Sequence, residues 1–147
     1  MATGISPRLR AAVDALPIEP ESRVLEIGCG PGVAARAVAE RLRTGRVLAT
    51  DRSPGAIAQA LRGSAAEIAG GRMAVRCVAA EDLVLDEGEE PYDLVFAIRV
   101  GALDGRHPEA GFRTLERIAA VTTPDARLFV DGGDPLREIT IPREARS

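Results

Sequence analysis

The sequence predicts an α/β fold: a doubly wound, mainly parallel sheet of five strands with helices on both faces. Short apolar runs rich in Val, Ile and Leu recur along the chain, which is typical of strands buried on both faces. Between them lie stretches of roughly 10–20 residues whose apolar positions follow helical spacing, and such alternation indicates parallel strands joined by crossover helices. No internal repeat or low-complexity linker divides the 147 residues. We therefore expect residues 1–147 to form a single domain.

The expected strands are short apolar segments that end at polar or glycine-rich turns. RVLEI runs into a glycine loop, RVLAT closes on Asp51, and YDLVFAI is apolar almost throughout. The C-terminal stretch has room for one further strand, with Ile139 and Ile141 on one side. The five main strands are expected at 23–27, 46–50, 73–79, 92–98 and 126–130.

Ser-Pro pairs and glycines mark the expected helix boundaries. Ser6 and Ser53 each precede a proline, so that serine caps the helix and proline takes its first position. Gly45 and the glycines at 70–71 supply helix stops. The charged stretch 81–91 is expected to be a solvated loop, its acids included. Helices are expected at 7–16, 32–43, 54–69 and about 108–121, the last with Phe112, Leu115 and Ile118 on its core face.

Composition argues against several classes of function. The net charge is −3 and only four residues are aromatic, so the chain lacks the basic surface and stacking groups that nucleic acids require. No apolar run approaches the roughly 18–20 residues of a membrane span, and the N-terminus lacks a secretory signal. Cys29 and Cys77 fit no metal spacing and are expected to be buried, reduced thiols. We expect a cytoplasmic protein that binds neither nucleic acid, membrane nor metal.

Three alternate glycines follow the first strand, and they predict a ligand site. Gly28, Gly30 and Gly32 let the backbone approach a ligand at the carboxyl end of the sheet, where open α/β sheets bind theirs. About twenty residues later Asp51 ends the second strand, where a carboxylate can accept both hydroxyls of a ribose. The alternative is that Asp51 is a turn carboxylate beside Ser53. The first interpretation predicts a ligand that contains a nucleoside.

The residues around the glycines distinguish two kinds of nucleoside cofactor. Nicotinamide and flavin binders follow G-x-G-x-x-G, which would require glycine where this chain has Val33. Glu26, two residues before the first glycine, would repel a pyrophosphate. The pattern acid-x-Gly-x-Gly-x-Gly suits a cationic ligand such as S-adenosylmethionine, with its ammonium and sulfonium. A nicotinamide-dependent oxidoreductase is the less favoured alternative.

At VLEIGCGPG, Asp51, PYDLVFAI and ARLFVDGG the chain resembles the class I S-adenosylmethionine-dependent methyltransferases, over roughly residues 23–133. The resemblance implies a Rossmann-like sheet in the order 3-2-1-4-5. Relatives continue after the fifth strand with a helix and a hairpin, and this chain is expected to be a short form without most of that hairpin. It implies S-adenosylmethionine as cofactor and S-adenosylhomocysteine as product. It places the glycine loop under the methionine part, Glu26 below the amino group and Asp51 on the ribose. The implied cofactor-binding residues are Glu26, Gly28, Cys29, Gly30, Gly32, Asp51, Arg52, Ala80, Glu81, Asp82 and Ile98.

The chain also departs from the family pattern. Ala79 stands where relatives often carry the acid that binds adenine, so backbone near Ala80 with Glu81 or Asp82 would take over, or both acids belong to a solvated loop. Arg99 is a candidate for binding an anionic substrate, with a structural ion pair to Glu26 or Asp104 as the alternative. His107 is a candidate general base, with a helix-cap role as the alternative.

The sequence therefore predicts a methyltransferase that acts on a small-molecule acceptor. Methyl transfer is a direct displacement in which the protein mainly aligns the reactants, which fits the lack of a catalytic triad. The alternative is a non-catalytic adenosyl-cofactor-binding module or a subunit of a larger assembly. An open edge of the sheet leads to a further hypothesis, a homodimer that covers it.

Overall fold

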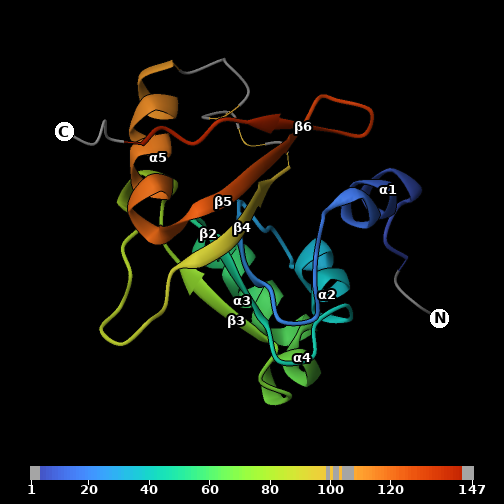
Figure 1. Cartoon of the computed structure of the whole chain (residues 1–147). Coiled ribbons are helices and arrows are strands. Elements are labelled where there is room, and N and C mark those ends of the chain that lie inside the picture. The colour runs from blue at the N-terminus through green and yellow to red at the C-terminus, as the bar shows by residue number, and fades with distance from the viewer. Residues whose placement is uncertain (1–3, 99, 101–102, 104–107, 144–147) are drawn as a thin grey trace.

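Six strands form one sheet in a computed structural model that describes residues 4–98, 100, 103 and 108–143 (Figure 1). The order is β3-β2-β1-β4-β5-β6, in which the first five strands pair in parallel and β6 runs antiparallel to β5. The expected order 3-2-1-4-5 and the further C-terminal strand are confirmed. The strands are β1 (Arg23–Ile27), β2 (Arg46–Asp51), β3 (Met73–Cys77), β4 (Tyr92–Ala97), β5 (Thr122–Asp131) and β6 (Leu136–Ile139).

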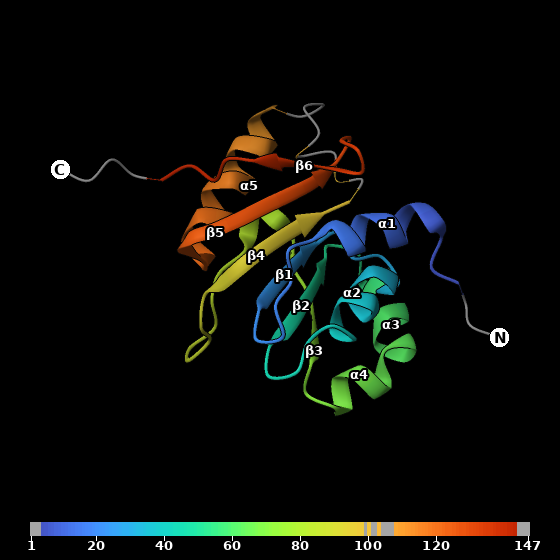
Figure 2. The same ribbon diagram turned by 45° about the vertical axis from the view of Figure 1, so that its right-hand side comes forward.

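Helices cover both faces of the sheet, as expected for a doubly wound fold (Figure 2). One apolar core joins Val24 and Phe96 of the sheet to the helices that precede β3, and a second joins Leu25 and Val95 to the helix before β5. Successive strand residues thus enter opposite cores, as the pleat requires. The helices are α1 (Pro7–Ala15), α2 (Val33–Ala39), α3 (Pro54–Gly63), α4 (Ala65–Ala69) and α5 (Pro108–Val121), with the 3-10 turn η1 (Ala80–Asp82) after β3.

Two expected helices are shorter than their sequence pattern. The helix expected to reach residue 43 ends at Ala39, because the backbone N–H groups of residues 43–45 all donate to the Pro20 carbonyl and hold a turn there. The helix expected over 54–69 breaks at Ser64 into α3 and α4. Ser64 is fully buried, and its Oγ accepts a hydrogen bond from Arg36 Nη1 at 3.0 Å. Both differences arise from tertiary contacts that local periodicity does not encode.

Other differences concern the C-terminal half of the sheet and single side chains. The strand expected over 73–79 ends at Cys77, and the one expected over 126–130 begins at Thr122, directly after α5. Phe112 was expected in the core but is 63% exposed, and Cys77 is exposed whereas Cys29 is buried. Ile141 is buried beyond the end of β6.

Among the described residues no helix is long and apolar enough to cross a membrane.

The acidic loop 83–91 is not the fully solvated segment that its charge predicts. The Glu89 side chain accepts hydrogen bonds from Arg76 Nη2, from the Tyr92 hydroxyl and from the backbone N–H of Asp86. Arg76 also forms an ion pair with Asp86 at 3.0 Å. These contacts fasten the loop to the sheet through β3 and β4.

Candidate functional site

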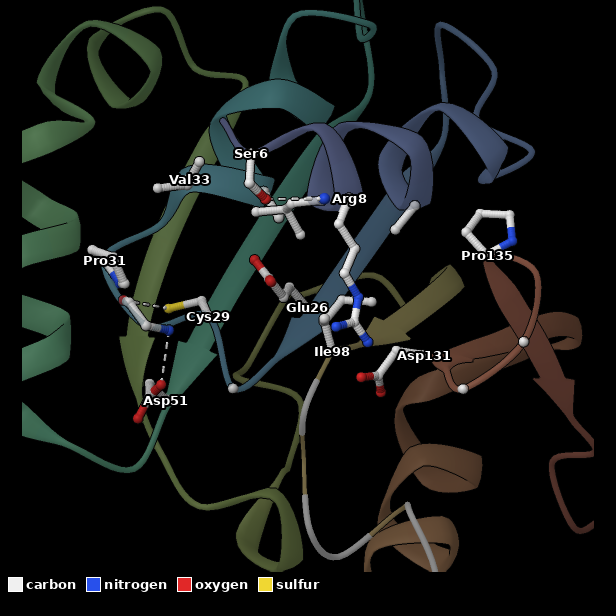
Figure 3. A pocket seen from close by; sticks show the side chains of 17 residues that line it. Ser6, Arg8, Glu26, Cys29, Pro31, Val33, Asp51, Ile98, Asp131 and Pro135 are labelled. Atoms are coloured by element: carbon white, nitrogen blue, oxygen red, sulfur yellow. Dashed lines mark hydrogen bonds between the residues drawn. The ribbon is translucent and has the colours of Figure 1, made fainter. Parts of the chain in front are cut away.

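A cavity of about 650 Å³ opens at the carboxyl ends of the parallel strands (Figure 3). Its floor is the end of β1 with the glycine loop, and its other walls come from α1, from the end of β2 and from the turn after β5. This is the end of the sheet at which open α/β folds bind ligands. A cavity of this size lies within the ordinary range for small-molecule and cofactor sites.

The glycine loop presents backbone to the cavity because three of its residues adopt left-handed conformations. The φ angles are +74° at Gly28, +53° at Gly30 and +89° at Gly32. A Cβ at Gly28 would lie 2.7 Å from Val100 Cγ2, whereas a Cβ at Gly30 would meet nothing within 4 Å. Gly30 therefore faces open space, and both its φ angle and the cavity beside it favour glycine.

Glu26 carries a buried carboxyl group, one oxygen of which has no hydrogen-bonding partner among the described residues. The residue is 2% exposed, and its Oε1 accepts no hydrogen bond from the described part of the chain. Burial, with a smaller contribution from the nearby charge of Asp51, raises the pKa of Glu26 to about 8. Figure 3 shows the carboxyl group directed into the cavity. A buried polar atom without a partner is costly to the fold, and a ligand in the cavity that donated to this oxygen would offset that cost.

Asp51 forms hydrogen bonds within the turn and also lines the cavity. Its Oδ1 accepts from the Ser53 backbone N–H and its Oδ2 from the Gly30 backbone N–H, both at 2.9 Å. It is thus a turn carboxylate, and it ties the glycine loop to β2. Asp51 also lines the cavity, and each carboxylate oxygen keeps a second lone pair with which to accept a ligand hydroxyl.

The structure brings some of the other predicted residues to the cavity and leaves others outside it. Cys29 and Ile98 line it, and burial raises the pKa of the Cys29 thiol to about 12, which keeps it neutral. Gly32 begins α2, where a Cβ would crowd Ala60 and Ser64 at 3.3 Å, so this glycine serves helix packing. Arg52, Ala80, Glu81 and Asp82 lie outside the lining, and Arg99 and His107 lie outside the described residues.

Two segments of the lining were missed by sequence reasoning. Ser6, Arg8, Leu9 and Ala12 come from α1, and Asp131 to Gly133 with Pro135 come from the turn after β5. The Ser-Pro cap predicted a helix at α1, but no local pattern placed that helix over the glycine loop. A signal did exist for the second segment, since Gly132 and Gly133 follow a predicted strand in the same way as the glycines after β1.

The fold and the cavity together define a Rossmann-like domain that binds a ligand at the carboxyl ends of its strands. Residues 24–125 match the protein family described as "Methyltransferase domain". The chain belongs to this family, which is part of the class I methyltransferases that use S-adenosylmethionine.

Curated relatives and solved structures agree with this assignment. The chain is 38% identical over 87 residues to a trans-aconitate 2-methyltransferase of Streptomyces avermitilis, covering 59% of this chain and 31% of the relative. It is 31% identical over 134 residues to a trans-aconitate 2-methyltransferase of Methylobacterium nodulans, covering 89% of this chain and 47% of the relative. The chain therefore spans less than half the length of these curated relatives.

Among solved structures, the fold is similar to that of a SAM-dependent methyltransferase from Aquifex aeolicus. That match has a TM-score of 0.68 at 16% identity and covers 83% of this chain and 62% of the other. Coclaurine N-methyltransferase bound to N-methylheliamine and SAH gives a TM-score of 0.66 at 20% identity, covering 83% of this chain and 34% of the other. These likenesses support the fold.

The cavity lining fits the family's cofactor. A cationic ligand would supply the partner that Glu26 Oε1 lacks, and the open space at Gly30 leaves room for it against the backbone. Asp51 offers acceptors for hydroxyl groups at one end of the same cavity. The nicotinamide alternative is not supported, because a buried carboxyl beneath the glycine loop disfavours a pyrophosphate.

Proposed function

We propose that this chain transfers a methyl group from S-adenosylmethionine to a small carboxylic acid. The observation that carries the cofactor half of the proposal is Glu26, a buried residue that lines the cavity beneath the glycine loop and whose Oε1 has no partner in the described part of the chain. Burial, followed by the charge of Asp51, raises the pKa of this carboxyl group to about 8, and a bound cation would stabilise its charged form. We expect residues 1–147 to act as one domain in this reaction.

In this proposal each cavity residue has a separate task. Glu26 accepts the cofactor's ammonium group, Asp51 accepts the ribose hydroxyls, and the backbone of Gly28 and Gly30 supports the chain between them. Cys29 and Ile98 provide apolar wall, which limits the water around the reacting groups. When bound, the cofactor supplies an electrophilic methyl group on a sulfonium, and the protein's contribution is to align it with the acceptor.

Adenine recognition is assigned to the segment after β3. Val78 N donates to the Asp51 carbonyl, and Cys77 is in register with Asp51, so η1 begins near the carboxyl end of β2. Glu81 lies 3.9 Å from Arg52. We propose that Glu81 or Asp82, with the backbone at Ala80, takes the place of the acid that Ala79 lacks. Gly32 supports the loop from outside the lining.

The acceptor class rests on the relatives, both of which are named trans-aconitate 2-methyltransferases. The test is an assay with S-adenosylmethionine labelled in its methyl group, offered trans-aconitate, citrate, a phenol and a primary amine. We expect label in a base-labile ester of a carboxylic acid, and none with the phenol or amine. Transfer to the phenol or amine would overturn the acceptor class. Binding of S-adenosylhomocysteine without transfer to any acceptor would instead favour the non-catalytic binding module.

Homodimer formation is a separate proposal that rests on the edges of the sheet. β3 and β6 are the outer strands, and outer strands present unpaired backbone groups. Light scattering at micromolar concentration tests it. A dimeric mass is expected, and a monomer alone would contradict it.

A further inference from the structure

The turn η1 is held at both of its ends by hydrogen bonds to other elements. Before the turn, Val78 N donates to the Asp51 carbonyl at 3.0 Å, at the end of β2. After the turn, the Leu83 carbonyl accepts from Arg117 Nε of α5 at 2.7 Å. Leu83 itself is 2% exposed and belongs to the core between the sheet and α5. The three residues of η1 are therefore suspended between β2 and α5.

The bonding inside η1 is too weak to fix the position of the turn by itself. Asp82 N donates to the Ala79 carbonyl at 2.9 Å, but Leu83 N lies 3.4 Å from the Ala80 carbonyl, beyond the usual range of such bonds. Ala79 is the N-cap residue, and it has no side-chain oxygen with which to cap the turn. Short 3-10 turns have poor hydrogen-bond geometry of their own. The contacts at the two ends thus decide where η1 lies.

Arg117 supplies the contact from α5. The helix packs against η1, and the ribbon views show the segment after β3 beside α5 (Figure 1 and Figure 2). The neighbouring Ile118 is fully buried in the same core, which fixes this part of α5. The half-buried Arg117 forms no ion pair with any residue that the structure describes, and its Nε bonds to Leu83. A hydrogen bond from a charged donor is stronger than one between neutral groups.

The position of η1 matters because the proposed adenine acceptors lie on the turn itself. Ala79, at the end of the preceding strand segment, contributes no carboxylate. The amino group of adenine is instead assigned to Glu81 or Asp82. A hydrogen bond weakens steeply outside its narrow distance range, so a shift of η1 by about 1 Å would remove it. Recognition of the base in this chain thus depends on what holds the turn in place.

We propose that Arg117 is a positioning residue for adenine: by holding the Leu83 carbonyl, it keeps the carboxylates of η1 where they accept the amino group of the base. The proposal rests on the proposed function, since it requires S-adenosylmethionine in the cavity. It gives α5 a role in selecting the cofactor, although none of the residues 108–121 lines the cavity. Arg117 acts through η1 and does not touch the ligand.

Calorimetric binding of three ligands to the full chain tests the proposal. S-adenosylhomocysteine and S-inosylhomocysteine differ in the base alone, because hypoxanthine has a carbonyl oxygen where adenine has its amino group. We expect the wild type to prefer S-adenosylhomocysteine by at least about tenfold, the scale of a hydrogen bond to a charged group. 5′-Methylthioadenosine has the same nucleoside and sulfur as S-adenosylhomocysteine without the amino-acid part, and it reports on the base independently of Glu26.

Two substitutions at Arg117 separate its hydrogen bond from its bulk. Arg117→Met keeps an unbranched side chain and removes the donor, so the preference should fall to within about threefold. S-adenosylhomocysteine and 5′-methylthioadenosine should weaken by the same factor, and S-inosylhomocysteine should stay within about twofold of the wild type. Arg117→Gln keeps an N–H as many bonds from Cα as Nε is, and should retain a preference of at least about fivefold. Arg113→Met is the matched control, because Arg113 is exposed on the same helix and forms no hydrogen bond or ion pair with the described residues.

The outcomes distinguish a failure of this proposal from a failure of the proposed function. A tenfold preference that survives Arg117→Met, or is lost equally in Arg117→Gln, would overturn the role of Arg117. Equal weakening of all three ligands would overturn it too, since that is the result of a purely structural role. A wild type that binds both homocysteine ligands equally would overturn the assignment of adenine to η1, and one that binds none of the three would overturn the cofactor assignment. Circular dichroism checks folding, with Arg117→Ala as the substitute if Arg117→Met does not fold.

Discussion

Two glutamates of this chain differ in burial and in partners, and their pKa values shift in opposite directions. Glu26 is 2% exposed, its Oε1 lacks a partner among the described residues, and burial followed by the charge of Asp51 raises its pKa to about 8. The Glu89 side chain is 12% exposed. Burial alone would raise its pKa, but hydrogen bonds from Tyr92, the Asp86 backbone and Arg76 lower it below the usual value. Deep burial sets the pKa of Glu26, whereas at the less buried Glu89 the hydrogen-bonding partners outweigh burial.

The difference shows how the fold divides its acids between stability and binding. Glu89 is ionised in a closed network that fastens the acidic loop to the sheet, so its charge contributes to the folded state. In the proposed function, Glu26 keeps its hydrogen-bonding capacity for the cofactor, at a cost to stability. A carboxyl group whose pKa is raised by folding destabilises the protein progressively as the pH rises from the unfolded value of about 4.5 to about 8.

The largest expected effect comes from closing the cavity at Gly30. In Gly30→Val the side chain would enter the open space beside the loop at a φ of +53°, and we expect S-adenosylhomocysteine binding to be lost. Gly71→Val is the matched control, since Gly71 has a φ of +80° in open space and lies outside the cavity lining. Both variants carry backbone strain, but calorimetry is expected to find binding lost only in the first. If Gly30→Val bound S-adenosylhomocysteine with wild-type affinity, the proposed placement of the cofactor against the glycine loop would be contradicted.

Asp51→Ala is expected to have the next largest effect. The change removes the acceptors proposed for the ribose and the two hydrogen bonds that hold the loop at Gly30 and Ser53. Binding of S-adenosylhomocysteine should weaken by about 1.5–3 kcal/mol, the scale of charged hydrogen bonds, while the domain stays folded. Because the ribose is common to both ligands, 5′-methylthioadenosine should weaken by a similar factor. Unchanged affinity would show that the ribose is held elsewhere.

Glu26→Gln tests the comparison of the two glutamates through the pH dependence of ligand binding. Binding of a cation beside Glu26 favours its ionised form, so wild-type binding should release a proton and strengthen as the pH rises from 6 to about 8. Calorimetry in buffers of different ionisation enthalpy measures that release. The variant should show neither the release nor the pH dependence, and should bind more weakly at pH 8. In the absence of ligand it should be more stable than the wild type at pH 8, by on the order of 1–3 kcal/mol.

The smallest effect on binding is expected at Glu89. Glu89→Gln should lower the free energy of unfolding by about 0.5–1.5 kcal/mol at pH 7, because it weakens the network with Arg76 and Tyr92. Since folding lowers the pKa of Glu89, this difference is present above pH 4.5 and disappears as the pH falls through the folded-state value. Denaturant titrations at several pH values measure it. A change in S-adenosylhomocysteine affinity would contradict the claim that Glu89 serves stability and not ligand binding.

Local sequence patterns were sufficient for the parallel strands and for the glycine loop at the floor of the cavity, whereas the strand order came from the family resemblance. The strand after each helix, the glycine loop and the position of Asp51 follow from periodicity and turn chemistry. Long-range contacts decided the rest. Arg41 fixes α1 over the cavity, the Pro20 carbonyl ends α2 early, and Arg36 meets Ser64 where α3 and α4 separate. The acids of loop 83–91 looked solvated because their spacing gives no sign of the Arg76 and Tyr92 side chains that meet Glu89.

The pKa of Glu26 tests the central claim most directly. Carbon-detected nuclear magnetic resonance of side-chain carboxyl groups, assigned with Glu26→Gln, follows this residue with and without S-adenosylhomocysteine. We expect a titration near pH 8 in the free protein and a pKa lower by at least about one unit when the ligand is bound. A free-state pKa near 4.5, or a value that the ligand leaves unchanged, would contradict a carboxyl group held without a partner for the cofactor's ammonium.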